Sequence, residues 1–247
     1  MLLSNKNAVV TGCLKGIGKK TLETFAEQGA NVWACAQHAD EEFERFCTEL
    51  AKRTNTWIKP VYFDFTDADA VKAGLKTIML DKQPVDVLVN VAGFTKDAIF
   101  HMTSMEQLKL IFEVNYFSQI LIAQYITKLM VRQKRGSVIN IASISGMDGS
   151  HGQLAYSSSK AALIGATRTM SRELAQQGIR VNAIAPGVID TEMNAVVPEK
   201  VLAGHIKGMS IQRMGSSSEV ANAILFLASD LSRYMTGQII RVDGGMK

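Results

Sequence analysis

The sequence has few of the residues that mark secreted or multidomain chains. Only three cysteines occur among the 247 residues, and Cys13, Cys35 and Cys47 have neither metal-site nor redox-pair spacing. We therefore expect buried thiols, no metal site and a reducing, cytoplasmic compartment. Only four prolines occur, and no tract rich in proline and glycine divides the chain. The chain is expected to form one domain, residues 1–247.

Long apolar runs and an excess of one charge are also missing. No run approaches the roughly 18 apolar residues of a membrane span, and the amino terminus lacks a basic segment followed by an apolar one. The 27 basic and 23 acidic residues are scattered. The densest basic stretch, residues 132–136, is typical of a solvated helix end. We expect no membrane or nucleic-acid partner, whereas an acidic protein partner remains an alternative there.

Short runs rich in Val and Ile recur along the chain and alternate with helical segments. Two of these segments, residues 40–53 and 217–230, begin with Asp or Ser, which often cap helices. The apolar runs lack regular polar alternation, which indicates strands buried on both faces. The alternation predicts a doubly wound α/β fold with helices on both faces of a parallel sheet. Seven strands are expected, at residues 7–12, 31–36, 57–63, 85–90, 136–143, 179–186 and 237–243.

Residues 187–215 are the one long stretch without a clear helical or strand pattern. An insertion of this kind between a strand and a helix is usually a lid or a binding loop. Its composition indicates a flexible apolar channel, with ordinary packing as the alternative. The residues concerned are Met193, Val196, Val197, Met209 and Met214.

Three glycines, Gly12, Gly16 and Gly18, lie in "TGCLKGIG", between the first expected strand and the first helix. Such glycines permit a sharp reversal, a close approach of the backbone to a pyrophosphate, and close packing of helix on sheet. The start of the helix then offers N–H groups and a partial positive charge to the phosphates. The pattern predicts a dinucleotide site.

The end of the second expected strand lacks the acidic residue that usually binds the ribose hydroxyls of NAD. Gln37 and His38 stand there instead. Lys15, inside the glycine turn, can pair with a 2′-phosphate, which favours NADP(H). The alternative is an ordinary solvated lysine, so NAD remains open.

Tyr156 and Lys160 are four residues apart and share one face if their segment is helical. Free tyrosine has a pKa of about 10, and an adjacent cation can lower a neighbour's pKa by roughly 1 to 3 units. We therefore expect Lys160 to lower the pKa of Tyr156, which would let the phenol donate a proton to a carbonyl. Ser143, at the end of the fifth expected strand, is a candidate donor to the same oxygen. The alternatives are that Tyr156 and Lys160 form an ordinary helical pair, and that Ser143 only belongs to a turn at the strand end.

Ordered motifs over nearly the whole chain resemble those of the classical short-chain dehydrogenase/reductases. The matching segments are "TGCLKGIG", "YFDFTD", "NVAG", "VN" at 114–115, "IASISG", "YSSSK", "IRVNAIAPGVIDTEM" and "VDGGM". The resemblance implies a single-domain Rossmann fold and a catalytic set of Asn115, Ser143, Tyr156 and Lys160. In this set, Asn115 holds a water that relays protons to Lys160, and Lys160 also binds the nicotinamide ribose.

The resemblance also implies a set of cofactor contacts along the strand ends. They are Gly12, Leu14, Lys15, Gly16, Ile17, Gly18, Gln37, Asp64, Phe65, Asn90, Ala92, Gly93, Tyr156, Lys160, Pro186, Gly187, Ile189 and Thr191. An Asn after a strand can instead satisfy backbone groups, so Asn90 has a structural alternative. Two residues depart from the family pattern: Leu14 replaces a Ser that many NADP-dependent relatives carry, and Val91 replaces the second Asn of "NNAG".

Within the family, the segments are most similar to those of β-ketoacyl-[acyl-carrier-protein] reductases. This implies reduction by NADPH of the 3-keto group of a thioester on acyl carrier protein, with Lys134 and Arg135 as candidate docking residues. A second basic position of those enzymes is Gln177 here. The alternatives are a relative that reduces a keto sugar or another small carbonyl, and a silent dinucleotide-sensing scaffold. Relatives form tetramers through the helices near Met105 and Gln153 and the last strand, so we expect a homotetramer.

Overall fold

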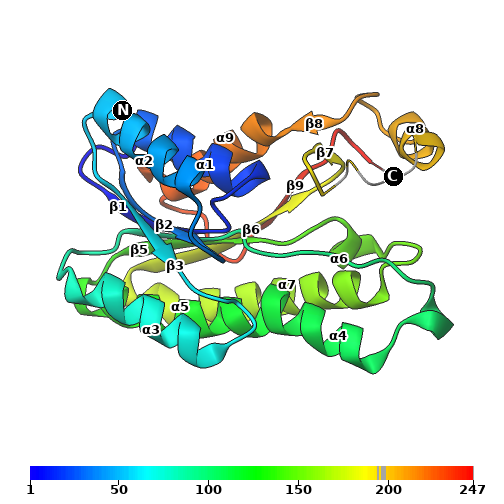
Figure 1. Ribbon diagram of the computed structural model, residues 1–247, viewed down its shortest axis with the longest axis horizontal. Coiled ribbons are helices and arrows are strands. Elements are labelled where there is room, and N and C mark those ends of the chain that lie inside the picture. Colours follow the sequence, from blue (N-terminus) through cyan, green and yellow to red (C-terminus); the bar gives the residue numbers. More distant parts are fainter. Residues whose placement is uncertain (194, 196–198, 247) are drawn as a thin grey trace.

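A seven-stranded parallel sheet forms the centre of the molecule, in the order β3-β2-β1-β4-β5-β6-β9 (Figure 1). The computed structural model describes residues 1–193, 195 and 199–246. The predicted doubly wound sheet, with its seven strands, is confirmed. Its strands are β1 (Asn7–Thr11), β2 (Asn31–Ala36), β3 (Ile58–Tyr62), β4 (Val87–Asn90), β5 (Gly136–Ile141), β6 (Ile179–Pro186) and β9 (Ile239–Val242).

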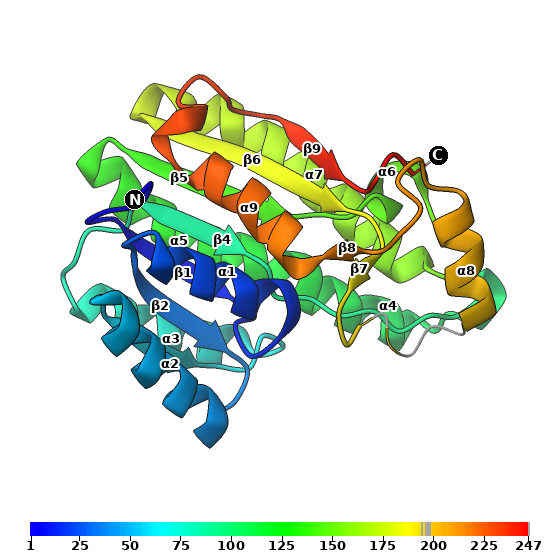
Figure 2. The same ribbon diagram turned by 90° about the horizontal axis from the view of Figure 1, so that it is seen from above.

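Helices cover both faces of this sheet (Figures 1 and 2). One layer consists of α1 (Gly16–Glu27), α2 (Glu41–Thr54) and α9 (Ser217–Ala228). The other layer consists of α3 (Ala68–Leu80), α4 (Met105–Phe112), α5 (Ser118–Gln133) and α7 (Leu154–Leu174). Because all seven strands are parallel, their carboxyl ends meet at one edge, where ligands bind in open α/β sheets.

Several short elements complete the chain. A π-helical turn, Glu113–Phe117, joins α4 to α5, and α6 (Ser145–Asp148) follows β5. Single 3₁₀ turns lie at Phe100–Met102, Ala175–Gln177 and Asp230–Ser232.

The stretch 187–215 has more regular structure than its sequence predicts. It contains α8 (Glu199–Lys207), and β7 (Ile189–Asp190) pairs with β8 (Gly215–Ser216) in a small parallel sheet. The expectation of an irregular stretch was therefore wrong over these elements. The described part of α8 has no buried residue. Val196 and Val197 lie outside the described residues.

Two apolar clusters, one on each side of the sheet, form most of the core. Phe25 of α1 packs in the first, and Trp33 of β2 packs in the second. The three cysteines are free and buried, as predicted. Burial raises the pKa of the Cys35 thiol to about 12, so this thiol stays protonated near neutrality.

Four of the described α-helices begin at a side chain that accepts a backbone N–H. Asp40 caps α2, Asp67 caps α3 and Ser104 caps α4. Ser216 and Glu219 form a reciprocal capping box at the start of α9. The helix starts predicted at residues 40 and 217 agree with these caps to within one residue.

Candidate active site

The turn between β1 and α1 is tightly packed around its glycines. Gly12 has a φ of +70°, and a Cβ there would lie 3.0 Å from the backbone of Ala92, at the end of β4. A Cβ on Gly18 would lie 2.0 Å from the carbonyl oxygen of Gly12. The predicted roles of these glycines in the reversal and in the packing of α1 on the sheet are therefore confirmed.

The start of α1 is suited to an anion. Lys15 is the N-cap residue, its side chain makes no capping bond, and the first turn has no acidic residue. The first N–H groups of a helix need acceptors, and the helix dipole favours a negative group there. The close-packed turn and the uncapped helix start therefore fit the pyrophosphate of a dinucleotide.

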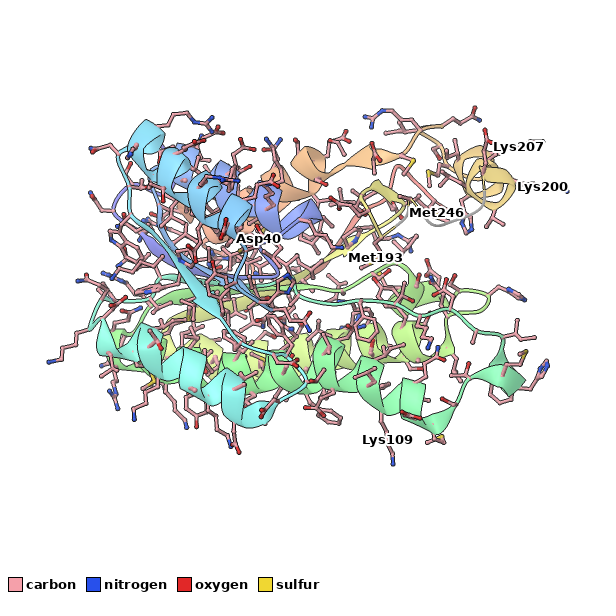
Figure 3. The ribbon with its side chains drawn as sticks, in the orientation of Figure 1. Asp40, Lys109, Met193, Lys200, Lys207 and Met246 are labelled. Atoms are coloured by element: carbon pink, nitrogen blue, oxygen red, sulfur yellow. The ribbon has the colours of Figure 1, made fainter. Side chains whose placement is uncertain are left out.

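The two residues that directly follow Ala36 at the end of β2 are not acidic. Gln37 and His38 are exposed at the end of the strand. The first acidic residue after them, Asp40, accepts the N–H of Phe43 at 2.7 Å and so caps α2 (Figure 3). Lys15 is exposed on the glycine turn.

The segment after β4 is held by hydrogen bonds from β1. The Thr11 hydroxyl accepts the N–H groups of Val91 at 2.9 Å and Ala92 at 3.0 Å. The Val91 side chain packs against the core, so this departure from the family pattern serves packing. Ala92 lies against Gly12, so the glycine turn and the end of β4 are in contact, as the predicted set of cofactor contacts requires.

Asn90 is buried beneath this edge, with 1 % of its surface exposed. Its amide donates to the Asn140 side chain of β5 at 2.9 Å, and Asn140 donates to Thr167 of α7 at 2.9 Å. The Asn90 side chain thus joins two strands and a helix. This is the structural role that the sequence allowed as the alternative to a cofactor contact. The Asn90 Oδ1 is one of the few buried polar side-chain atoms without a partner among the described residues.

Asp64 and Phe65 also have structural partners. Asp64 Oδ1 accepts both the N–H and the hydroxyl of Thr66 at 2.8 Å, in a local turn. Phe65 is buried and its ring centroid is 4.9 Å from that of Phe63. Their cofactor contacts remain a prediction.

The four predicted catalytic residues come together at the carboxyl edge. Ser143 follows β5, and its side chain lowers the pKa of the Tyr156 phenol on α7. The Lys160 Nζ lies 5.8 Å from the centre of the Tyr156 ring, on the same face of the helix. A Cβ on Gly93 would lie 3.1 Å from Asn115 Oδ1 and 3.3 Å from Lys160 Nζ, so these two side chains converge on Gly93.

Asn115 lies in the π-helical turn between α4 and α5 and is fully buried. Its side chain accepts the N–H of Phe94 at 3.0 Å, and donates to the carbonyl of Phe94 at 2.9 Å and to Ser159 at 3.2 Å. Such turns often occur at functional sites. The side chain of Asn115 therefore ties the segment after β4 to α7, and its water-holding role remains a prediction.

The expected effect of Lys160 on Tyr156 was wrong. The Tyr156 side chain is partly buried, and this burial raises the pKa of its phenol. Ser143 lowers this pKa and the charge of Asp97 raises it, so that the net shift is upward. The Lys160 ammonium donates instead to the carbonyl of Ile141 at 2.7 Å, below the tyrosine ring. The spacing of four residues predicted the shared face, but it could not reveal how deeply each group is buried.

Lys160 is 3 % exposed, and burial lowers the pKa of its ammonium from 10.5 to about 8. Between these values, the unfolded chain binds more protons at this group than the folded chain does. The penalty of burying the cation is therefore fully present below about pH 8 and disappears as the pH rises through the unfolded value.

We expect the wild-type protein to gain stability relative to a Lys160→Met variant as the pH rises from neutral to about 9.5. Thermal unfolding of both proteins at the two pH values measures this change. The raised pKa of Tyr156 acts in the opposite direction only above about pH 10, where the free phenol ionises. A constant difference in melting temperature would contradict the buried cation.

The last part of the predicted cofactor region lies over the start of α1. A Cβ on Gly16 would lie 3.4 Å from Thr191, and a Cβ on Gly187 would lie 2.8 Å from Asp243 after β9. Pro186 ends β6, and Ile189 in β7 is buried. Leu14 and Ile17 are half-buried and pack against the core beside the glycine turn.

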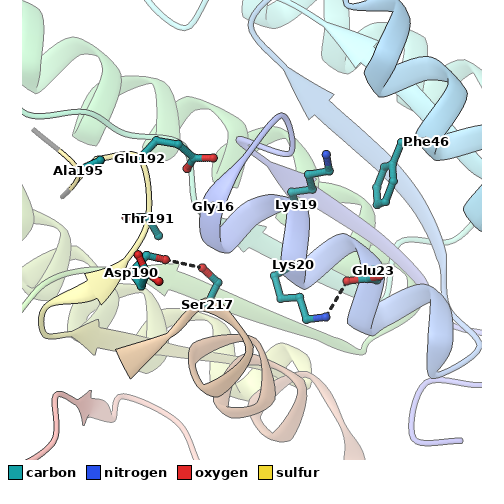
Figure 4. Close-up of a pocket in the computed structure, with 10 residues that line it drawn as sticks. All are labelled: Gly16, Lys19, Lys20, Glu23, Phe46, Asp190, Thr191, Glu192, Ala195 and Ser217. Carbon is teal, nitrogen blue, oxygen red and sulfur yellow. Dashed lines mark hydrogen bonds and ion pairs between the residues drawn. The ribbon is translucent and has the colours of Figure 1, made fainter. Parts of the chain in front are cut away.

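A cavity of about 640 Å³ lies on the outer side of α1 (Figure 4). It borders Gly16 and Thr191, and Lys19, whose ammonium lies 4.7 Å from the centre of the Phe46 ring. None of the four predicted catalytic residues lines this cavity. This cavity is therefore separate from the predicted catalytic group.

The predicted lid lies at the same end of the molecule as the site. Figure 3 shows Met193, Lys200, Lys207 and Met246 at the end that carries the carboxyl terminus. Met209 is buried and forms an isolated β-bridge with Met246, whereas Met193 is exposed. The described methionines of this segment therefore differ in role, and one of them serves packing.

Lys134 and Arg135 lie at the opposite edge of the sheet from the site. Lys134 ends α5, and Arg135 precedes β5 and pairs with the buried Asp86 at 3.0 Å. The predicted solvated helix end is confirmed. A carrier protein bound here would lie at the far end of β5 from Ser143, so this pair could serve the site only of another copy of the chain.

Sequence reasoning missed Asp97, Ser145 and Gln153, which border the catalytic residues. Gln153 donates to Asp97 at 3.1 Å across 56 positions of sequence. No local pattern signals such a pair, because topology alone brings the two segments together.

Neither a membrane-crossing helix nor a metal-binding cluster was found in the part of the chain that the structure describes. No helix there is both long and apolar enough to span a bilayer. No group of three or more His, Cys, Asp or Glu residues there is arranged to hold a metal ion.

Comparisons with known proteins agree with this geometry. A 3-oxoacyl-[acyl-carrier-protein] reductase of Chlamydia trachomatis is 38% identical over 99% of this chain and 98% of its own. A crystal structure of a 3-oxoacyl-[acyl-carrier protein] reductase with bound NAD from Brucella melitensis has a TM-score of 0.90 and 29% identity, over 99% of this chain and 92% of that chain.

A second crystal structure, from Beutenbergia cavernae, is described as a candidate NAD(P)-dependent gluconate 5-dehydrogenase with NADP bound at low occupancy. Its TM-score is 0.93 at 28% identity, over 98% of this chain and 96% of that chain. The family model described as Enoyl-(Acyl carrier protein) reductase matches residues 12–247. With the parallel sheet, the glycine turn and the Ser143, Tyr156 and Lys160 group in place, the chain belongs to the short-chain dehydrogenase/reductase family.

Proposed function

We propose that the protein reduces the 3-keto group of a β-ketoacyl thioester carried on acyl carrier protein, with NADPH as the reductant. The observation that carries this proposal is the group of Ser143, Tyr156 and Lys160 at the edge that also holds the glycine turn. The names of the full-length relatives from Chlamydia trachomatis and Thermotoga maritima support the choice of substrate.

The nicotinamide, when bound, supplies a hydride to the carbonyl carbon. The chain's own residues handle the proton and the oxygen. Because the pKa of Tyr156 is raised, the phenol is protonated at neutral pH and can donate to the carbonyl oxygen. Ser143 lowers the pKa of the phenol and can reach the same substrate oxygen.

Lys160 supplies a buried positive charge beneath the phenol. With a pKa of about 8, its ammonium is mostly charged at neutral pH. It lies close to Tyr156, so it favours the phenolate that forms once the proton has left. Burial thus keeps the phenol protonated before the reaction, and the lysine stabilises its anion afterwards.

A substrate panel tests this function. NADPH oxidation is followed with acetoacetyl thioesters of acyl carrier protein and of a small thiol, and with keto sugars and simple ketones. The proposed function predicts the highest kcat/KM for the carrier-bound thioester. Preference for a keto sugar would favour the second candidate, which the similarity to the Beutenbergia cavernae structure supports. Tight NADPH binding without any turnover would indicate a sensor.

We propose NADP(H) as the cofactor because Lys15 is exposed on the glycine turn and the residues that directly follow β2, Gln37 and His38, are not acidic. A Lys15→Glu variant is expected to bind NADPH at least about 10-fold more weakly while NADH affinity changes little, because only NADPH carries the 2′-phosphate. Dissociation constants for both cofactors measure this. Equal losses for the two cofactors would mean that Lys15 does not contact the phosphate.

We also propose a homotetramer. Exposed apolar side chains lie along the 3₁₀ turn before α4, on α4 itself and at the start of α5, at Phe100, Met102, Met105, Leu110 and Phe117. A second copy of the chain would cover this face. In such an assembly, Lys134 and Arg135 of one copy are available to a carrier protein that delivers its substrate to another. The molar mass in solution, measured by light scattering, tests the tetramer.

A further inference from the structure

A chain of hydrogen bonds runs from Asp97 to Ser143, next to the catalytic phenol. Asp97 lies after β4 and accepts the amide of Gln153, at the start of α7, at 3.1 Å. The Gln153 carbonyl accepts the hydroxyl of Ser145 at 3.1 Å. The N–H of Ser145 donates to the hydroxyl oxygen of Ser143 at 3.1 Å, and Ser143 in turn lowers the pKa of the Tyr156 phenol. Segments after two neighbouring strands are thereby connected to the proton donor.

The backbone fixes the same contact. The N–H of Ala98 donates to the carbonyl of Gly152 at 2.8 Å, and Ala98 pairs with Gln153 in an isolated β-bridge. The Thr95 hydroxyl donates to the other oxygen of Asp97 at 2.5 Å, which fixes the carboxylate. Asp97 is therefore fixed relative to α7 although its side chain is exposed.

The charge on Asp97 sets the direction of the two side-chain bonds nearest to it, while the backbone N–H of Ser145 can only donate. A carboxylate only accepts, so the Gln153 NH₂ must face Asp97 and its carbonyl must face Ser145. The hydroxyl of Ser145 is then used as a donor to Gln153. The N–H of Ser145 occupies one lone pair of Ser143, which leaves the proton of Ser143 free to bond to the phenol or substrate oxygen.

We propose, on the basis of the function proposed above, that Asp97 is a positioning residue of the carbonyl-reduction site. It orients Ser143 through Gln153 and Ser145. Among the described residues, the charged groups that act on this phenol are Lys160 from its own helix and Asp97 from the segment after β4. Lys160 favours the phenolate, whereas Asp97 favours the neutral phenol before the reaction.

An Asp97→Asn variant tests this role. We expect kcat to fall about 3- to 10-fold, as for the loss of one oriented hydrogen bond, with the NADPH dissociation constant nearly unchanged. The high-pH limb of the kcat profile should move to lower pH, because the negative charge that opposes ionisation is removed. This shift should shrink at high salt, since an exposed charge is screened. A merely structural defect would not produce a salt-dependent shift.

A Gln153→Leu variant separates the two effects. It breaks the chain but keeps the carboxylate, so kcat should fall without a shift of the high-pH limb. Asp230→Asn is the matched control: the same change at an exposed residue, whose carboxylate pairs with Arg233 at 2.8 Å, should leave both quantities as in the wild type. Wild-type kcat and pH profile in both Asp97→Asn and Gln153→Leu would overturn the proposal.

The test does not depend on which carbonyl compound is the substrate. Turnover of acetoacetyl thioesters by the wild type tests the proposed function, whereas the ratio of variant to wild type tests Asp97. The phenol can also be titrated without turnover. The tyrosinate absorbance of each protein is measured against pH, and the absorbance of the same protein carrying Tyr156→Phe is subtracted. A lower phenol pKa in Asp97→Asn supports the inference even if the substrate proves to be a keto sugar, and an unchanged pKa counts against it.

Discussion

A Tyr156→Phe variant is expected to lose turnover by about 100-fold or more while its NADPH dissociation constant changes less than about twofold. The substitution removes only the phenolic oxygen. The ring remains to pack above the Lys160 ammonium, which lies 5.8 Å from its centre and donates to Ile141 independently of the phenol. Binding and folding should therefore survive, and kcat and kcat/KM should fall together because the lost interaction belongs to proton transfer.

Steady-state kinetics with NADPH and the best substrate of the panel measure this loss. Tyr234→Phe is the matched control, because this side chain is fully exposed and the same oxygen is removed. Its kcat should equal that of the wild type. Turnover of Tyr156→Phe within a few-fold of the wild type would reject the tyrosine as the proton donor.

The shift in the pKa of Tyr156 changes how the site must work. A phenol whose pKa were lowered near neutrality would be partly ionised before the carbonyl arrives and would be a poor donor in that fraction. The buried phenol is fully protonated instead, with Asp97 reinforcing the effect of burial. The Lys160 charge then contributes mainly when the phenolate forms, so the pair acts at different stages of one proton transfer.

Much of this site follows from local sequence because its parts are local. The glycine turn is set by the spacing of Gly12, Gly16 and Gly18 within one β-α unit, and the shared face of Tyr156 and Lys160 follows from the helical repeat. The seven strands were recognisable as apolar runs because both faces of the sheet are covered. The family resemblance then supplied Asn115, which lies in the π-helical turn, where no local pattern marks it as functional.

What failed depends on tertiary structure. Depth of burial decides the pKa of Tyr156, and the position of Arg135 at the amino edge of β5 decides which active site it can serve. Neither property is encoded in spacing along the chain. The bond between Asp97 and Gln153 spans 56 residues, so it exists only because the sheet brings the two segments together. The short helix α8, which has no buried residue in its described part, was not predicted.

The packing of the glycine turn gives the largest expected effect on stability. A Gly18→Ala variant would place its new methyl 2.0 Å from the carbonyl oxygen of Gly12 and 2.6 Å from its carbonyl carbon. Both are backbone atoms, so α1 must move away from the turn. We expect a loss of about 3 kcal/mol or more in the free energy of unfolding, which corresponds to roughly 6 to 12 °C in melting temperature for a chain of this size.

The same displacement should weaken NADPH binding by about 10-fold or more, because the uncapped N–H groups at the start of α1 would no longer face the turn. Gly165→Ala is the matched control, since this exposed glycine lies inside α7 with no atom within 4 Å of the added methyl. Alanine favours a helix interior over glycine by about 0.5 to 1 kcal/mol, so this variant should melt at a higher temperature than the wild type. Thermal unfolding and cofactor titration of both variants test this. A lower melting temperature for Gly18→Ala and a higher one for Gly165→Ala would show that contact with Gly12 excludes a side chain at residue 18. A Gly18→Ala protein with wild-type stability and cofactor affinity would mean that the turn and α1 are not packed as described.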